Sequence, residues 1–324
     1  MSTPATADVV RLYETGGPEV LRVETEDVAE PGHGQVRLRQ EALGLNYVDT
    51  FFRDGTFPLP VPRVIGVEAA GVVDAVGDGV TEFAVGDRAG YYFSPGAYRE
   101  YRIIEASQLI PLPDDAAFGV AASILAKGLT AWARLRRVHP VGEGTLAVVT
   151  GASGGVGSLL APWARRLGAD VIAVVARPEA VAPLHALGVD DVAVAGTGEL
   201  QKLVERAGRP VDVAYDQVGQ AVIGELIGVL GQGSLLDLLG SASGDAGPSL
   251  DAALGAGIRI ARSSTGEHLP TRQVLLHATD ELFDALRTGV FGDRVPHSYP
   301  LEDVVQAHRD IEARAAGPAP ILIP

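Results

Sequence analysis

The stretch Leu146-Ala147-Val148-Val149-Thr150-Gly151-Ala152-Ser153-Gly154-Gly155-Val156-Gly157 decides the fold of this 324-residue chain. Its first five residues form an almost entirely apolar run, which is typical of a strand buried in a parallel sheet. A helical pattern over 156–167 and a second apolar run over 171–175 follow the glycines. Glycines at such a turn let the backbone approach a pyrophosphate closely, and the helix N-terminus offers unpaired N–H groups. The stretch therefore predicts a nucleotide-binding βαβ unit. The alternative is a plain tight turn in a nucleotide-free protein.

The same alternation continues beyond the second strand. Helical patterns cover 181–187 and 223–230, and strand-like runs cover 211–215 and 234–239. Strands that alternate with helices predict an α/β fold with a parallel, doubly wound sheet of the Rossmann kind.

The flanking regions have a different character. Short apolar or alternating runs at 9–12, 35–39 and 69–75 are separated by glycine-rich turns, which predicts an irregular β-barrel or sandwich. The tail predicts helices over 272–288 and 301–314 and a closing strand over 321–323. We expect the β-rich start and the mixed tail to form one domain, with the nucleotide fold inserted between them.

Composition excludes several classes of function. The formal net charge is −15, which disfavours nucleic acid and membrane surfaces as partners and leaves a small-molecule substrate. There is no cysteine, so disulfides, thiolate zinc sites, iron–sulfur clusters and a cysteine nucleophile are excluded. Neither a secretory leader nor a long apolar run is present, so we expect a cytoplasmic protein.

One arginine bears on the choice of nucleotide. The second strand of a NAD site ordinarily ends near an acidic residue that binds the ribose 2′-OH. Here Arg177 stands at that place, about twenty residues beyond the glycine turn. A guanidinium suits a 2′-phosphate, which favours NADP. The alternative is an ordinary surface arginine.

These residues, and others in the same order along the chain, resemble the zinc-independent quinone oxidoreductase branch of the medium-chain dehydrogenase/reductase superfamily. The resemblance runs nearly end to end. Its motifs are Gly16–Leu21, Gly44–Thr50, Gly66–Gly71, Val85–Arg88, Gly96–Tyr101, Lys127–Ala131, Gly151–Gly157, Tyr215–Gly219 and Tyr299–Leu301 with Ala307–His308. The resemblance implies a GroES-like catalytic domain over 1–127 and 263–324 and a Rossmann domain over 128–262, with the nicotinamide in the cleft between them.

The zinc ligands of related alcohol dehydrogenases are missing. Asn46 stands near the position of the ligand cysteine, and Val67 occupies the position of the ligand histidine. We therefore expect no metal. Without a Lewis acid, an alcohol is a poor substrate, whereas an electron-poor C=C bond or a quinone delocalises the added charge itself. The resemblance thus implies hydride transfer from NADPH, with NADH possible, to a quinone or another unsaturated carbonyl compound.

The resemblance also implies a set of cofactor contacts. Two departures at this site weaken the expected preference for NADPH, because Ala180 and Ala195 replace a lysine and a tyrosine that relatives often carry. Ala261-Arg262-Ser263 also departs from the Thr-Arg-Pro segment of many relatives. The expected contacts are Asn46, Thr130, Ser153, Gly154, Gly155, Val156, Gly157, Arg177, Gln217, Leu239, Gly240, Ser241 and Arg262.

Asn46 and Tyr47 are the candidate catalytic residues. Their amide and phenol are expected beside the nicotinamide and substrate, where they would bond an oxygen that gains negative charge. The proton would come from Tyr47 or from solvent. Asp49 is interpreted as a carboxylate that orders the loop, Glu68 as a structural ion-pair partner, and His268 as the one histidine to inspect for a pocket role.

Aromatic residues are expected to line the substrate pocket, because flat surfaces suit flat acceptors. The candidates are Phe51, Tyr91 and Tyr92. Packing in the core of the β-rich domain is the alternative for the tyrosines.

Two other functions stay open. One is an enone or enoyl reductase that acts on a biosynthetic metabolite, and the other is a non-catalytic NADPH-binding protein with a structural or sensing role. A homodimer is also expected, because relatives join their Rossmann sheets edge to edge. The strand near Ser234–Leu239 and its neighbours would supply that edge.

Overall fold

The computed structural model describes residues 3–240, 242–244 and 247–324. It divides into two compact units, which we call unit 1 (residues 1–126 and 294–324) and unit 2 (residues 127–293). The first boundary falls within helix α2 (Phe118–Ala133), close to the predicted position. The second boundary differs from the prediction, which ended the nucleotide domain at residue 262.

The later boundary follows from the packing of helix α8 (Arg272–Arg287). A Cβ atom on Gly128 would lie 2.4 Å from Leu282 Cδ1, so α8 packs directly on the C-terminal part of α2. Arg136 Nε donates a hydrogen bond to Glu281 at 3.0 Å. These contacts are all within unit 2, and they keep residues 263–293 with the nucleotide fold.

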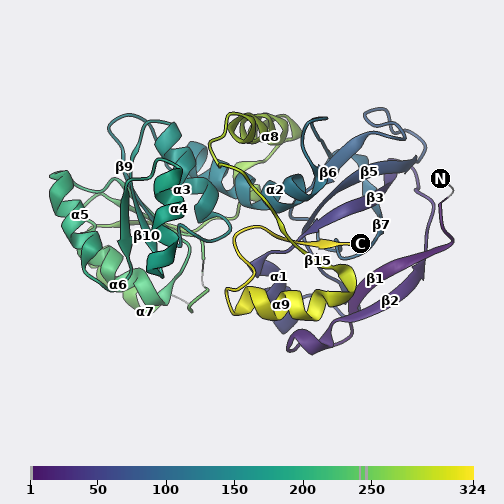
Figure 1. Cartoon of the computed structure of the whole chain (residues 1–324), viewed down its shortest axis with the longest axis horizontal. Coiled ribbons are helices and arrows are strands. Elements are labelled where there is room, and N and C mark those ends of the chain that lie inside the picture. Colours follow the sequence, from purple (N-terminus) through teal and green to yellow (C-terminus); the bar gives the residue numbers. More distant parts are fainter. Residues whose placement is uncertain (1–2, 241, 245–246) are drawn as a thin grey trace. The chain divides into compact units, whose positions relative to one another are not determined.

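Unit 2 holds a six-stranded, fully parallel sheet, as predicted (Figure 1). The strand order is β11-β10-β9-β12-β13-β14, so the chain reverses its direction of winding between β9 and β12. Ligands bind doubly wound sheets at the carboxyl ends of the strands at such a switch point. The strands are β9 (Leu146–Thr150), β10 (Asp170–Val175), β11 (Asp191–Val194), β12 (Val213–Asp216), β13 (Leu235–Leu238) and β14 (Arg259–Ala261).

The helices predicted in unit 2 are confirmed within a few residues, and two further helices join them. Figure 1 shows the helices between β9 and α8 in teal and green around β9 and β10. The α-helices of unit 2 that follow β9 are α3 (Gly157–Arg166), α4 (Val181–Ala186), α5 (Glu199–Ala207), α6 (Gln220–Val229), α7 (Gly247–Gly255) and α8. Apolar residues of β9, β10, β12 and β13 form the core with apolar residues of α5 and α6.

Unit 1 is rich in antiparallel strands. A three-stranded sheet has the order β2-β1-β4, and a seven-stranded sheet has the order β15-β16-β3-β5-β6-β8, with β7 also paired to β3. The strands are β1 (Thr6–Leu12), β2 (Arg22–Asp27), β3 (Gln35–Gly44), β4 (Arg63–Val64), β5 (Glu68–Val76), β6 (Arg88–Tyr91), β7 (Tyr101–Glu105), β8 (Ile110–Pro111), β15 (His297–Pro300) and β16 (Pro320–Ile323). Residues 294–324 of the tail therefore belong to unit 1, whereas the predicted tail helix over 272–288 lies in unit 2.

Two helices of unit 1 bear on the site. Helix α1 (Tyr47–Asp54) begins after Asn46, whose backbone N–H donates to Asp49 Oδ2 at 2.8 Å. Helix α9 (Val304–Glu312) lies within the predicted range 301–314, but its first turn, Leu301–Asp303, is a 3-10 helix. Within the described part of the chain, we find no helix both long and apolar enough to cross a membrane.

Candidate active site

The glycine turn at the end of β9 has a backbone that only glycine fits. Gly151 adopts φ 59°, in the left-handed region. The Gly154 N–H donates to the Gly151 carbonyl at 2.8 Å, which closes the turn. A Cβ atom on Gly157 would lie 2.3 Å from the same carbonyl oxygen, so a side chain there would displace the backbone. Helix α3 therefore starts as close to the strand as a main chain can approach.

The N-terminus of α3 is suited to an anion. Its N-cap is Val156, whose side chain makes no capping hydrogen bond. The first N–H groups of a helix have no partners within the helix, and they carry the positive end of its dipole. Ser153 is exposed, and Gly154, Gly155 and Val156 are half-buried, so a ligand can reach this turn.

The ends of β12 and β13 converge on the same edge of the sheet. The Gln217 N–H donates to Thr150 Oγ1 at 3.0 Å, and the Thr150 hydroxyl donates to Asp216 Oδ1 at 2.7 Å. A Cβ atom on Gly240 would lie 2.2 Å from the Gln217 carbonyl oxygen. The structure thus brings together Gly151, Gln217 and Gly240, three positions at which the sequence predicted cofactor contacts or the turn that precedes them.

Gln217 has a buried nitrogen without a partner. Its Nε2 atom has no hydrogen-bond acceptor among the residues that the structure describes. A buried amide nitrogen ordinarily finds an acceptor, so the orphaned atom at this edge indicates a place where a bound molecule supplies one. The glycine cradle and this amide together fit a dinucleotide.

Asp216 is a residue of this edge to which the sequence analysis gave no role. Its carboxylate accepts hydrogen bonds from Thr150, from the Val218 N–H at 3.0 Å and from the Gly219 N–H at 3.1 Å. Burial raises the pKa of Asp216, and these three donors oppose that shift. The signal that could have found it is an acidic residue at the very end of an apolar strand.

The other predicted cofactor contacts lie around this edge or beyond it. Arg177 is exposed, two residues after β10, in extended backbone. Leu239 is half-buried after β13, and its N–H donates to the Asp216 carbonyl at 2.8 Å. Arg262 is exposed directly after β14. Ser241 lies outside the described residues.

Thr130 and His268 belong to a polar cluster of unit 2 that joins the end of α2 to the segment after β14. The hydroxyls of Thr130 and Thr265 lie 2.9 Å apart. Arg134 donates to the Ser263 hydroxyl at 2.9 Å, and that hydroxyl lies 2.7 Å from His268 Nε2. Burial, and then the charge of Arg134, lower the pKa of His268. The cluster orders the segment that follows β14.

In unit 1, Asn46 is held at two points. It is 7% exposed, and its Nδ2 donates to Glu68 Oε1 at 2.7 Å, in addition to the backbone bond to Asp49. Glu68 is completely buried, and its other oxygen accepts from the Ala126 N–H at 2.6 Å. Through these contacts with Asn46 and Ala126, Glu68 fixes the Asn46 carboxamide, and its role as an ion-pair partner stays a prediction. Asp49 orders the start of the helix, as interpreted.

Tyr47 is the first residue of α1 and is half-buried. Its ring meets the ring of Phe51 edge to face, with centroids 5.4 Å apart, and Phe51 meets Phe57 in the same way at 5.3 Å. Phe57 is 44% exposed. Tyr47 and Phe51 therefore belong to a row of aromatic rings that reaches the surface of unit 1.

The two predicted pocket tyrosines differ in their surroundings. Tyr91 is completely buried; its hydroxyl donates to Gln40, and the Arg102 guanidinium lies 4.4 Å from its ring centroid. Core packing, the alternative weighed for Tyr91, is what the structure shows. Tyr92 is half-buried against Phe93, and burial raises its pKa to about 12.

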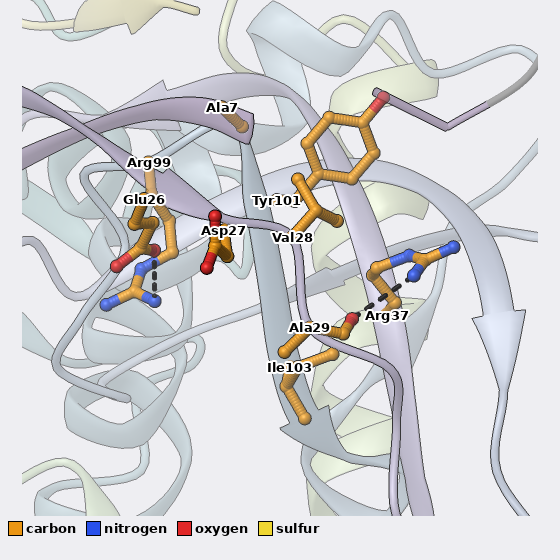
Figure 2. A pocket seen from close by; sticks show the side chains of 9 residues that line it. All are labelled: Ala7, Glu26, Asp27, Val28, Ala29, Arg37, Arg99, Tyr101 and Ile103. Atoms are coloured by element: carbon orange, nitrogen blue, oxygen red, sulfur yellow. Dashed lines mark hydrogen bonds and ion pairs between the residues drawn. The ribbon is translucent and has the colours of Figure 1, made fainter. Parts of the chain in front are cut away.

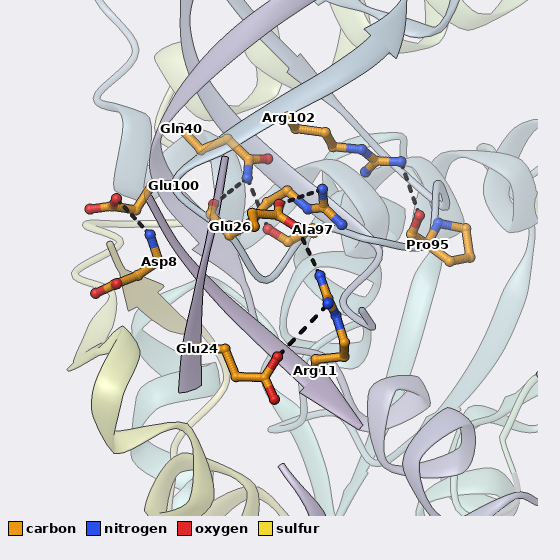
Figure 3. Close-up of polar contacts among 10 residues, drawn as sticks. Asp8, Arg11, Glu24, Glu26, Gln40, Pro95, Ala97, Glu100 and Arg102 are labelled. Carbon is orange, nitrogen blue, oxygen red and sulfur yellow. Dashed lines mark hydrogen bonds and ion pairs between the residues drawn. The ribbon is translucent and has the colours of Figure 1, made fainter. Parts of the chain in front are cut away.

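A separate cavity of about 150 Å³ lies elsewhere in unit 1 (Figure 2). Three of its charged lining residues are already paired, since Arg99 donates to Glu26 at 2.8 Å and Arg37 to Asp74 at 2.7 Å. Figure 3 shows that Arg11 approaches Glu26 as well, at 2.8 Å. None of the predicted site residues lines this cavity.

The positions of the zinc ligands of related dehydrogenases hold Asn46 and Val67, of which Val67 is apolar and 1% exposed. Over the described ranges, no group of three or more His, Cys, Asp or Glu side chains is placed to hold a metal ion.

Comparisons with known proteins agree with this architecture. Residues 32–114 match the alcohol dehydrogenase GroES-like domain family, and residues 187–317 match the zinc-binding dehydrogenase family. A 2-haloacrylate reductase of Burkholderia sp is 34% identical over 97% of this chain and 98% of its own length. A quinone oxidoreductase of Pseudomonas aeruginosa is 33% identical over 97% of this chain and 99% of its own length.

A solved structure extends the match to three dimensions. The Escherichia coli quinone oxidoreductase complexed with NADPH superposes with a TM-score of 0.92 at 32% identity, over 99% of this chain and 100% of that one. Full-length identity above 30%, two matching domain families and the same fold agree with the motifs in the sequence. The chain belongs to the quinone oxidoreductase branch of the medium-chain dehydrogenase/reductase superfamily.

Proposed function

We propose that this protein is an NADPH-dependent oxidoreductase that reduces a quinone or a similarly electron-poor unsaturated carbonyl compound without zinc. The observation that carries the proposal is the glycine turn of Gly151–Gly157, joined to the uncapped N-terminus of α3 at the switch point of the sheet. The quinone oxidoreductase relatives, one of them complexed with NADPH, support the same assignment.

The residues of unit 2 would hold the cofactor. The turn from Ser153 to Gly157 would bind the pyrophosphate through main-chain N–H groups, and Arg177 would pair with the 2′-phosphate. Gln217 Nε2 would donate its free N–H, and Thr130, Leu239, Gly240 and Arg262 supply further contacts. When bound, NADPH supplies the hydride for the reaction.

The residues of unit 1 would act on the acceptor. Asn46 Nδ2 carries two hydrogens, and Glu68 accepts one of them. The second is available to an acceptor oxygen, where it would stabilise the negative charge that develops as hydride arrives. The Tyr47 hydroxyl would bond the same oxygen, and the proton comes from this hydroxyl or from solvent. Phe51 and Tyr92 would offer apolar surface to a flat ring.

The absence of zinc is part of the proposal, and it rests on the residues at the ligand positions. Val67 has no donor atom, and Asn46 already binds Glu68 through its nitrogen. We expect elemental analysis of active protein to find no stoichiometric zinc, and EDTA to leave the activity intact. Activity that is lost on chelation and returns with zinc would contradict this part of the proposal.

A substrate panel tests the main assignment. NADPH oxidation, followed by absorbance, is measured with benzoquinones, naphthoquinones, enones and 2-haloacrylates. Fastest turnover of quinones supports the proposal. Fastest turnover of an acrylate or enone favours the second candidate, an enone-type reductase. The similarity to a 2-haloacrylate reductase is the observation that supports this candidate. NADPH binding without turnover of any acceptor favours the non-catalytic function.

We also propose a homodimer in solution. Of the strand near Ser234–Leu239 and its neighbours, β13 itself is an interior strand, because it pairs with β12 on one side and β14 on the other. β14 (Arg259–Ala261) ends the sheet on that side and would supply the edge. Light scattering at micromolar concentration should give the mass of two chains, and the mass of one chain would refute the dimer.

A further inference from the structure

A buried row of hydrogen bonds in unit 1 links α9 to the start of α1. Arg53 Nη1 lies 3.2 Å from His308 Nδ1, and His308 Nε2 lies 3.2 Å from the Tyr98 hydroxyl. That hydroxyl lies 2.9 Å from Asp49 Oδ2, which also receives the backbone N–H of Asn46. We call these four side chains, Arg53, His308, Tyr98 and Asp49, the His308 network. Each is at most 2% exposed.

The chemistry of the two ends fixes the direction of every hydrogen bond between them. A guanidinium only donates, so His308 Nδ1 must accept from Arg53. The imidazole hydrogen is therefore on Nε2, which donates to the Tyr98 oxygen. Tyr98 has one hydrogen, and it goes to Asp49, because an ionised carboxylate only accepts. Burial, and then the charge of Arg53, lower the pKa of His308 to about 3, so the ring is neutral and carries a single N–H.

The network ends at the turn that presents the candidate catalytic residues. Asp49 Oδ2 receives one hydrogen bond from Tyr98 and one from the backbone of Asn46. The position of that oxygen sets where α1 begins, and Tyr47 is the first residue of α1. The Asn46 side chain is held separately by Glu68, so the network acts on the backbone of the turn.

We propose that His308 and Tyr98 are positioning residues for Asn46 and Tyr47, acting through Asp49, with His308 held as the Nε2–H tautomer. This inference rests on the proposed function, because it assigns the geometry of the turn to the reduction of the acceptor. Because each of the four side chains is at most 2% exposed, the network acts through the turn and not by contact with a ligand. Its effect is to hold one main-chain N–H and one helix start in a fixed place.

Kinetics of two matched Tyr→Phe variants test the proposal. Tyr98→Phe removes the hydroxyl that joins His308 to Asp49. The control is Tyr299→Phe, also in unit 1. The Tyr299 hydroxyl donates to Asp310 at 2.9 Å, and Asp310 lies on α9, as His308 does. This hydrogen bond does not reach α1. We expect Tyr98→Phe to lower kcat/KM for the acceptor by about tenfold while the Kd for NADPH is unchanged. Tyr299→Phe should lower Tm without changing kcat/KM.

Rescue at His308 separates positioning from bulk. His308→Gln keeps an amide N–H for Tyr98 and an amide oxygen for Arg53, whereas His308→Leu keeps only volume. Recovery of kcat/KM in the glutamine variant but not in the leucine variant supports the proposal. Equal kcat/KM values in the two variants would overturn it.

A spectroscopic arm does not depend on turnover. Nitrogen-15 spectra of the wild type should place the His308 hydrogen on Nε2, and Tyr98→Phe, but not Tyr299→Phe, should shift the backbone amide resonance of Asn46. A hydrogen on Nδ1, or an unmoved Asn46 resonance, overturns the proposal. If the wild type reduces no acceptor, the proposed function fails, and these spectra still decide whether the network positions Asn46.

Discussion

Two buried polar regions, one in each unit, differ in how their charged side chains are hydrogen-bonded. In the His308 network of unit 1, a ring nitrogen or hydroxyl meets a partner at every step from Arg53 to Asp49. In unit 2, Asp237 is completely buried, and neither of its oxygens has a hydrogen-bond partner among the described residues. Arg134 Nε lies 3.6 Å away, while the other two nitrogens of that guanidinium bond Ser263.

The difference teaches what burial alone does to a charged group. A buried network with aligned donors and acceptors is rigid and stabilising, whereas a buried carboxylate without donors is destabilised in its charged form. Burial raises the pKa of Asp237 to about 6, and Asp216 adds to this shift while Arg134 opposes it. The His308 network therefore keeps its side chains in a fixed arrangement, whereas the protonation of Asp237 changes with pH.

The largest effect is expected from breaking the paired region. Arg53→Met should lower the free energy of unfolding by about 3–5 kcal/mol, because it leaves the buried His308 nitrogen and the Gly16 carbonyl oxygen without their donor and removes the ion pair with Glu312. Urea unfolding measures this. The control is Arg309→Met, which removes an exposed pair with Glu19 and should leave stability nearly unchanged. Equal losses of unfolding free energy in Arg53→Met and Arg309→Met would show that the His308 network stabilises the fold no more than an exposed ion pair does.

Asp237→Asn tests the unpaired region through pH. The folded state holds the Asp237 proton more tightly than the unfolded chain does, so this group contributes stability that is fully present below pH 3.8 and lost as pH rises to about 6. The difference in the free energy of unfolding, variant minus wild type, should therefore grow by about 3 kcal/mol between pH 4 and pH 8. A difference that stays flat across this range would show that Asp237 titrates normally.

Arg177→Ala tests whether the exposed Arg177 guanidinium binds the cofactor. A charge-assisted bond to a 2′-phosphate is worth about 1.5–3 kcal/mol, so the KM for NADPH should rise about ten- to hundredfold while the KM for NADH hardly changes. Ala180 and Ala195 place the expectation toward the lower value. Arg166→Ala, at the far end of α3 from the turn, is the control. Equal weakening of both cofactors would make Arg177 a surface residue.

The smallest effect is expected from replacing Gln217 in unit 2. Gln217→Leu removes an amide whose nitrogen has no acceptor among the residues that the structure describes, so the Tm of the ligand-free protein should not fall. The Kd for NADPH should nevertheless rise about tenfold, the value of one hydrogen bond. Gln232→Leu, in the turn before β13, should change neither quantity. A loss of stability without a loss of affinity would mean that Gln217 has only a structural role.

Most of unit 2 could be predicted from its sequence because its signals are local. The apolar run of β9, the glycine turn and the helix that follows are contiguous, and each restricts the backbone by itself. Strand β11 and helix α5 were missed because β11 is short, lies at the edge of the sheet and has one fully buried residue. The second boundary was missed because it depends on α8 packing against Gly128, a contact between distant segments.

In the candidate site too, residues with local sequence signals were predicted, and residues that act through distant contacts were not. Gly157 was predicted because the glycine turn is visible in the sequence, whereas the resemblance to a family supplied Gln217 and Gly240. The roles of Tyr98 and His308 were not, because their contact joins residues 210 positions apart and neither has a distinctive neighbour. The resemblance to a family supplied Asn46 and Tyr47, but only the structure shows how Glu68 and Asp49 hold them.

The pairing of β16 has a consequence for the order in which the two units are made. Ile321 pairs with Gly44 of β3, and the Leu45 N–H donates to the Pro320 carbonyl at 3.1 Å, directly before Asn46. A ribosome synthesises residues 127–293 before it reaches these partners, so unit 2 can fold as one contiguous stretch while β3 still has an open edge. An open edge invites pairing with other nascent chains. Unit 2 can thus mature first, and unit 1 is both the last to form and the more exposed to misassembly during translation.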